Sequence, residues 1–236
     1  MLIIRNLSIA FLLTLTLIGT FIFLTNFPGF GIKTIQIEGN QKVSDLDILN
    51  LCPVKLGQNF FKVDTDEISK KILSEPRIET VNIERLFPQR ILIRLSEKKP
   101  IYLINLGNMY GLTQRGEIIP LEENLDLPVV NVVSLKKVTL YHKIKDRKID
   151  FALSLHNSLA KIDANILNLI SEVNLKEKDN VILYLVPRGA KVFLGCGEFE
   201  KKLIRLSLIL REEKEFEKIE YVDLRFKGQA IVRRFE

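Results

Sequence analysis

The chain has 236 residues, no tryptophan and a formal net charge of +6 from 35 basic and 29 acidic side chains. After residue 32, charges of both signs are mixed along the sequence, which is typical of a solvated surface. A nucleic-acid-binding protein would need a basic face with aromatic or groove-reading elements. The sequence shows none, so no nucleic-acid partner is expected.

The first segment of the chain is apolar. No Asp, Glu, Lys or Arg occurs between Asn6 and Ile32. About 20 apolar residues, at 1.5 Å per residue, are enough to cross about 30 Å of hydrocarbon. We therefore predict a transmembrane helix over residues 7–27, preceded by a short tail at residues 1–6.

A cleaved secretory signal is the alternative for this segment. The apolar part of a signal is usually about 7–15 residues long and ends at a small-x-small site. The residues that follow the apolar segment here, TNFPGFG, contain no good signal-peptidase cleavage site, so an uncleaved anchor is favoured. Its orientation stays open, because Arg5 on one side and Lys33 and Lys42 on the other give no clear excess of basic residues.

Residues 32–100 show the pattern of a small α+β unit. Apolar residues alternate over 32–39, 79–87 and 90–100, as in strands that bury one face. Two segments of helical spacing lie between the first and second strands, and each begins at a residue that can cap a helix. The order strand, helix, helix, strand, strand predicts one three-stranded sheet with both helices on one face. The expected buried positions of the helices are Leu46, Ile48 and Leu49 in the first and Ile68, Ile72 and Leu73 in the second.

Residues 101–236 form a second, β-rich block with flanking helices. Strands are predicted over 101–107 and 109–120, around turns at Gly107-Asn108 and Arg115-Gly116, and over 127–133, 166–176, 180–186 and 190–195. The predicted helices are 148–162, with Ile149, Ala152, Leu155 and Leu159 on one face, and 198–218, with Leu203, Leu206 and Leu210 in the core and charges opposite.

The sequence shows no arrangement of side chains typical of an enzyme. Of the only two histidines, His142 and His156, the second lies among apolar residues on a predicted helix. The acidic runs at 45–47 and 64–67 stand where helices start, and carboxylates favour that positive end. The string LGCGE at 194–198 lacks the strand and helix context of a dinucleotide site. We predict no catalytic residue, no metal and no cofactor.

Two cysteines, Cys52 and Cys196, lie far apart in the sequence. A disulfide framework needs more cysteines than this. A single bridge stays open as an alternative, but two buried free thiols are the favoured interpretation.

The chain ends in YVDLRFKGQAIVRR, residues 221–234. The pattern predicts a strand, a two-residue break at Lys227-Gly228 and a second strand, with Gly228 able to take the positive φ of a tight hairpin. In the first strand Val222, Leu224 and Phe226 share one face, and the first two are expected in the core. No segment follows that could cover the last strand, so residues 229–233 are predicted to form an open edge to which a partner strand can add.

The order of these parts and several strings resemble the FtsQ/DivIB family of bacterial cell-division proteins. The first block is similar to its POTRA domain through IKTIQIEGN at 32–40 and the stretch 63–102, followed by LTQRGEIIP at 112–120. The second block resembles its β domain through LGCGEFEKKLIRL at 194–206 and the terminal YVDLRFKGQAIVR. One departure is Pro76-Arg77-Ile78, where the family commonly has Pro-Trp-Val.

The resemblance implies a bitopic, single-pass type II protein of the inner membrane, with a short cytoplasmic tail and its bulk in the periplasm at the division septum. It implies a non-enzymatic divisome scaffold that links early and late components. Its partners would be the periplasmic segments of FtsB and FtsL, and other divisome proteins through the POTRA domain and the transmembrane helix. No small-molecule substrate is expected. POTRA units also occur in secretion and outer-membrane assembly, which is the alternative function, but the second block leaves no room for a barrel of about 8 or more strands.

The resemblance also points to the terminal edge as the FtsB-binding surface. Phe226, the aromatic residue after DLR, is the expected main contact, and Arg225, Arg233 and Arg234 suit an acidic partner segment. Such exposed ion pairs are worth about 0.2–1 kcal/mol each. The predicted partner-binding residues are Tyr221, Arg225, Phe226, Gly228, Gln229, Ala230, Ile231, Val232 and Arg233.

Overall fold

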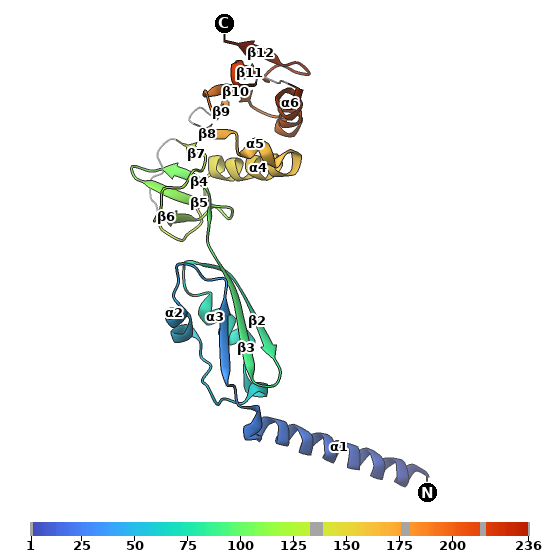
Figure 1. Ribbon diagram of the computed structural model, residues 1–236. Coiled ribbons are helices and arrows are strands. Elements are labelled where there is room, and N and C mark those ends of the chain that lie inside the picture. The colour runs from blue at the N-terminus through green and yellow to red at the C-terminus, as the bar shows by residue number, and fades with distance from the viewer. Residues whose placement is uncertain (1, 133–138, 176–179, 213–215, 236) are drawn as a thin grey trace. The chain divides into compact units, whose positions relative to one another are not determined.

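The computed structural model describes residues 2–132, 139–175, 180–212 and 216–235 (Figure 1). The chain divides into two compact units, Met1–Lys98 and Lys99–Glu236.

The first unit begins with a long helix and continues as a small sheet with two helices. Its elements are α1 (Leu2–Asn26), η1 (Pro28–Phe30), β1 (Thr34–Glu38), α2 (Asp45–Leu51), η2 (Phe60–Lys62), α3 (Thr65–Ile72), β2 (Ile78–Leu86) and β3 (Arg90–Glu97). Within α1, the stretch Arg5–Leu24 is long and apolar enough to cross a membrane. This fits the predicted transmembrane helix.

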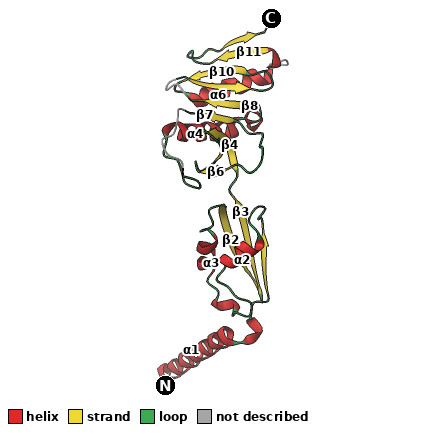
Figure 2. Ribbon diagram, turned by 90° about the vertical axis from the view of Figure 1, so that its left-hand side faces the viewer, coloured by secondary structure: helices red, strands yellow, loops and turns green. Residues whose placement is uncertain are grey.

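The sheet of the first unit has the order β1-β3-β2, with β3 antiparallel to β2 and parallel to β1. Figure 2 shows α2 and α3 on the same side of this sheet. Ile48 of α2, Ile68 and Ile72 of α3, and Ile91 and Ile93 of β3 form one buried cluster between helices and sheet. The predicted β-α-α-β-β order is confirmed.

The predicted burial of the two helices was wrong at three positions. Ile48 is buried in α2, but Leu46 is 71% exposed and Leu49 is also exposed. Because α2 has only seven residues and then turns into extended chain at Cys52, Ile48 is its one fully buried residue, and Leu51 packs against the same cluster while partly buried. In α3 the exposed residue is Leu73, which follows the last helical residue as its C-cap.

The second unit is one nine-stranded sheet with the order β12-β11-β10-β9-β8-β7-β4-β5-β6. Figure 1 shows α4, α5 and α6 on one side of this sheet. Its elements are β4 (Pro100–Asn105), β5 (Met109–Thr113), β6 (Ile118–Pro120), β7 (Val129–Asn131), α4 (Arg147–Ile162), α5 (Ala164–Leu167), β8 (Ile170–Asn174), β9 (Val181–Leu185), β10 (Ala190–Gly195), α6 (Phe199–Glu212), η3 (Phe216–Lys218), β11 (Ile219–Asp223) and β12 (Ile231–Arg234).

The core of the second unit lies between these helices and the sheet. The four positions predicted to share one face of α4 are all buried there: Ile149, Ala152, Leu155 and Leu159. The predicted α+β class, with an N-terminal apolar helix, is confirmed.

Two predicted elements of the second unit differ from their predicted bounds by four or more residues at one end. The strand expected over 166–176 begins only at Ile170, because the Asp163 side chain accepts a hydrogen bond from the Asn165 backbone and starts the short helix α5. The helix expected over 198–218 ends at Glu212, and η3 follows the undescribed residues 213–215. Residues 133 and 176, the ends of two predicted strands, also lie outside the described ranges.

Candidate functional site

In the part of the chain that the structure describes, the large sheet has one open edge. Strand β12 is last in the strand order and pairs only with β11 within the described residues. At the other end, β6 is covered, because Tyr141 donates to the Ile118 carbonyl and Glu117 forms a bridge with Lys143. A strand edge that no segment covers is a template for pairing with another chain.

The hydrogen-bond pattern shows which backbone groups of β12 face outward. The Leu224 N–H donates to the Phe193 carbonyl of β10 at 2.9 Å, so Asp223, one residue earlier, turns its own backbone groups toward β12. Asp223 is paired with Ile231 and Val222 with Val232. Because these groups alternate along an antiparallel pair, the N–H and C=O of Val232 point away from β11.

The connection between the last two strands is longer than predicted. Strand β11 ends at Asp223 and β12 begins at Ile231, so residues 224–230 form a loop in place of a two-residue hairpin. Gly228 has the predicted positive φ, +73°, but within this loop. Val222 and Leu224 are fully buried, as predicted, whereas Phe226 lies outside any strand and is 48% exposed.

Two basic residues of α6 shape this end of the unit, and the sequence analysis missed both. Arg205 donates from its Nη1 to the carbonyl of Gln229 at 2.6 Å, which ties the loop to the helix. Lys202 is buried, and its Nζ donates to the carbonyls of Leu194 and Cys196 at 2.7 and 2.8 Å. The expectation that the charges of this helix all lie opposite its core was therefore wrong. The sequence signal for this was the string KKLIRL, in which basic residues are interleaved with the apolar residues that face the core.

The predicted contact residues surround the edge in different settings. Ile231 is 46% exposed on the edge strand, while Val232 and Ala230 are partly buried against the core. The ring of Tyr221 packs edge-on against Phe193, with centroids 5.9 Å apart. Beside it lies a hollow of about 480 Å³, and the residues that line it include Lys191, Phe193, Tyr221, Arg225 and Phe235.

Two of the arginines expected to meet an acidic partner, Arg225 and Arg233, already have carboxylate partners. Arg225 binds both carboxylate oxygens of Asp223, with Nη2 at 2.6 Å from Oδ2 and Nε at 2.9 Å from Oδ1. This pair holds the pKa of the buried Asp223 below its usual range. Arg233 lies 2.9 Å from Glu220 through its Nε. Gln229 and Gly228 are exposed in the loop.

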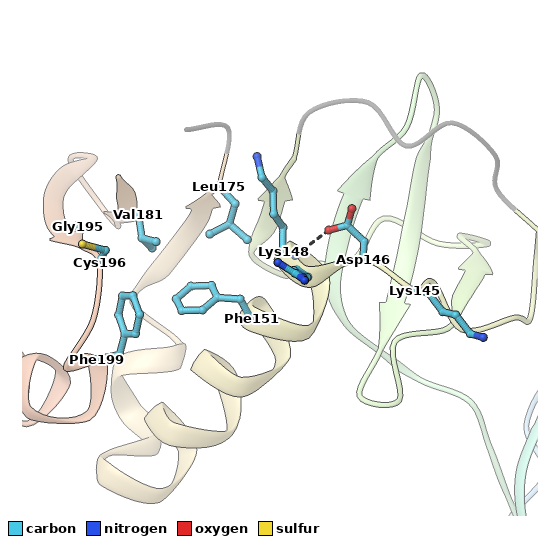
Figure 3. Close-up of a pocket in the computed structure, with 10 residues that line it drawn as sticks. Lys145, Asp146, Lys148, Phe151, Leu175, Val181, Gly195, Cys196 and Phe199 are labelled. Atoms are coloured by element: carbon cyan, nitrogen blue, oxygen red, sulfur yellow. Dashed lines mark hydrogen bonds between the residues drawn. The ribbon is translucent and has the colours of Figure 1, made fainter. Parts of the chain in front are cut away.

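A second hollow, of about 590 Å³, lies at the start of α4 (Figure 3). Phe151 and Phe199 meet in its wall with ring centroids 4.6 Å apart. Asp146, the one carboxylate among its described lining residues, accepts a hydrogen bond from the Lys148 backbone at 2.7 Å and acts as a helix cap. The free thiol of Cys196 at its rim is exposed, so the prediction of burial was wrong for this cysteine and confirmed for Cys52. The turn of Gly195 and Gly197, both with positive φ, carries Cys196 at the surface.

The described residues contain no group of three His, Cys, Asp or Glu side chains that could hold a metal ion. His156 is partly buried on α4 and packs edge-on against Tyr102, with ring centroids 5.2 Å apart. Burial lowers the pKa of His156, which favours its neutral form, as expected of a histidine held by packing.

Comparison with known proteins identifies both units. The family model "POTRA domain, FtsQ-type" matches residues 30–98, and "Cell division protein FtsQ/DivIB, C-terminal" matches residues 102–225. The second match alone spans more than half of the chain, and it ends before β12.

Similar relatives come from several bacteria. The cell division protein FtsQ of Syntrophotalea carbinolica is 28% identical over 219 residues, which cover 91% of this chain and 77% of the relative. FtsQ of Geobacter sp. is 27% identical over 86% of this chain and 76% of its own length. The cell division protein DivIB of Clostridium acetobutylicum is 26% identical over 86% of this chain and 83% of its own length. With an apolar N-terminal helix, a POTRA domain of FtsQ type and the C-terminal domain in that order, the chain belongs to the FtsQ/DivIB family of cell division proteins.

Proposed function

We propose that this chain is a non-enzymatic scaffold of the divisome that binds the periplasmic segments of FtsB and FtsL by strand addition at β12. It is anchored in the inner membrane by α1, with both folded units in the periplasm at the septum. Family membership supports the role in cell division. The single observation that carries the binding mode is the open edge at β12, where the Val232 backbone groups face outward.

The edge alone is too short to hold a partner tightly. Strand β12 has four residues, and each backbone hydrogen bond adds only about 0.5–1.5 kcal/mol net. A micromolar complex needs about 8 kcal/mol. The remainder must come from apolar contacts, and Phe226, Ile231 and Phe235 are the exposed large apolar side chains beside the edge. The partner should therefore cover the loop and the neighbouring hollow as well as the strand.

Charge in the partner would add selectivity more than affinity. An acidic side chain near the edge would compete with Glu220 for Arg233 and with Asp223 for Arg225. Both arginine side chains are about half exposed or more, so replacing one carboxylate partner by another changes the binding free energy little. The two arginines should mainly raise the rate at which an acidic partner associates at low salt.

Site-specific photo-crosslinking in dividing cells tests this proposal. A photoreactive amino acid at Ile231 should crosslink the full chain to FtsB or FtsL, since this side chain is exposed on the edge strand. The matched control is Met109, an exposed apolar residue on β5, seven strand spacings away in the same sheet, or about 34 Å. Crosslinks to these partners from Met109 but not from Ile231 would refute the proposed site.

A further inference from the structure

Phenylalanine rings gather where the chain leaves α1. Phe27 and Phe30 lie just after the helix, Phe60 and Phe61 in η2, and Phe87 in the turn between β2 and β3. We call these five residues the aromatic cluster. Successive rings are in contact, with centroid distances of 5.6 Å for Phe27–Phe30, 5.2 Å for Phe30–Phe61, 6.0 Å for Phe30–Phe87, 5.4 Å for Phe60–Phe61 and 6.1 Å for Phe60–Phe87.

Phe60 is the one ring of this cluster that is fully buried in the protein core. By contrast, Phe87 is 65% exposed, Phe27 43% and Phe61 38%. Leu56, in the loop before η2, is also exposed. Large apolar side chains exposed together in this way mark a surface that meets a partner or a membrane.

The aromatic cluster is held at the end of α1 by direct hydrogen bonds. The Asn59 side chain donates to the Leu24 carbonyl at 3.0 Å and so satisfies a carbonyl of the last helical turn. The Lys33 N–H donates to the Gln89 carbonyl at 2.8 Å, and Gly57 donates to Ile32 at 2.8 Å. The connection from α1 to β1 is therefore pinned on both sides, and the cluster cannot move far from the helix end.

The thickness of the membrane interface decides what surrounds these rings. The apolar stretch of α1 ends at Leu24, and Phe27 follows about 4.5 Å further along. The polar interface on each side of the hydrocarbon is roughly 5–7 Å thick. Phe27 thus lies within this polar interface. The Phe30 ring contacts that of Phe27, and the Phe87 ring contacts that of Phe30. Phenylalanine and leucine side chains are among those that protein segments at a membrane surface bury at the boundary between headgroups and acyl chains.

The charges beside the aromatic cluster complement anionic lipid. Lys33, Lys55, Lys62 and Arg90 are exposed and each lies within three residues of a cluster residue or of Leu56. Lys62 also donates to the Asn26 side chain at 3.3 Å, which places its ammonium group at the helix end. The first carboxylate after η2, Asp64, caps α3. Basic residues next to a membrane anchor are attracted to anionic headgroups.

We infer that the aromatic cluster is a lipid-docking surface. The exposed phenylalanines enter the bilayer interface around the chain's own α1, and the flanking cations bind phosphate groups of anionic lipids. Docking restricts the tilt of the POTRA unit on the membrane. This inference rests on α1 as a membrane anchor, but it requires no protein partner.

The absence of tryptophan from the chain allows a direct test. The variant Phe87→Trp, in the full chain reconstituted into vesicles of phosphatidylglycerol and phosphatidylethanolamine, carries a single reporter. Its emission should be blue-shifted and quenched several-fold more strongly by lipids brominated near the headgroup than that of Leu46→Trp. Leu46 is the matched control, because it is also an exposed apolar residue but lies at the other end of β1. Its neighbour Asp45 accepts a hydrogen bond from the Asn40 side chain, just beyond that end of the strand.

A third variant, Phe11→Trp on α1, reports insertion of the anchor. Quenching of Phe11→Trp without quenching of Phe87→Trp would overturn the docking surface and leave the anchor intact. A blue-shifted but unquenched Phe87→Trp would also overturn it, since protein rather than lipid would then cover the ring. If Phe11→Trp is not quenched, the anchor fails and the inference fails with it. Vesicles without phosphatidylglycerol should weaken the quenching of Phe87→Trp, and unchanged quenching would overturn the role of the cations.

Discussion

At the scale of single residues, the end of the second unit is organised by buried polar groups. Asp223 lies in the last paired position of β11 and is almost inaccessible, yet its carboxylate receives both the side chain and the backbone N–H of Arg225. A buried charge is tolerated when it is paired and hydrogen-bonded in this way. The ring of Phe193 lies under the same guanidinium, 5.1 Å from its carbon to the ring centroid. The pair therefore fixes the start of the loop that leads to the open edge.

This pair predicts an acid-sensitive contribution to stability. Arg225 lowers the pKa of Asp223 in the folded chain. Stabilisation is therefore present above the unfolded pKa of about 3.9 and is lost as the pH falls through the folded value. Asp223→Asn should lower the free energy of unfolding at pH 7 but flatten its decline below about pH 5. Urea unfolding at several pH values measures both effects, with the exposed Asp126→Asn as control. An unchanged decline in Asp223→Asn would show that the pair does not contribute.

At the scale of elements, turn glycines fix how strands and helices follow one another. Gly39 ends β1 with φ of +94°, and a Cβ at this position would lie 2.0 Å from the Leu95 carbonyl oxygen of β3. Gly57 has φ of +85°, but a Cβ there would meet no atom within 4 Å. The two positions thus share a backbone conformation that favours glycine and differ in the space around it.

The contrast between these glycines gives a matched prediction for the first unit. Gly57→Ala should cost roughly 1 kcal/mol, the usual penalty for a left-handed conformation. Gly39→Ala should cost clearly more, because β1 or β3 must also shift to accommodate the methyl group. Urea unfolding followed by circular dichroism compares the two variants. Equal losses in the free energy of unfolding would mean that β1 and β3 can move apart at Gly39 and Leu95 without a cost in stability.

Local patterns predicted most elements and the alternation of the last two strands, but not where these two strands end and begin. Alternating and helical spacing identified the β-α-α-β-β order of the first unit and the buried face of α4. The terminal hairpin was misplaced because Lys227-Gly228 is a local turn signal, whereas α6 holds the loop through Arg205, a contact distant in sequence. The outward direction of the Val232 backbone groups could not be predicted either, because it depends on how β12 pairs with β11 and β11 with β10.

At the scale of the whole molecule, the two cysteines differ in exposure and can report topology. Cys196 is exposed in the second unit and Cys52 is buried in the first. If both folded units lie in the periplasm, a membrane-impermeant maleimide should label the chain in intact spheroplasts, and Cys196→Ser should abolish the labelling. Labelling only after the cells are opened would place these units in the cytoplasm. Labelling that persists in Cys196→Ser would show that Cys52 is accessible.

Capture of the partner by the edge strand β12 can be tested with one pair of variants at Val232. Proline is tolerated on an edge strand when the lost N–H faces outward, so Val232→Pro should keep the fold and remove an N–H from the binding edge. Val232→Ala controls for the lost side chain, which packs partly against the core. The measurement is the affinity of the full chain for FtsB and FtsL, with circular dichroism to check folding. Val232→Ala should bind within a few-fold of the parent, and folded Val232→Pro should lose at least tenfold in affinity. Equal affinities for the two variants would contradict strand addition at β12.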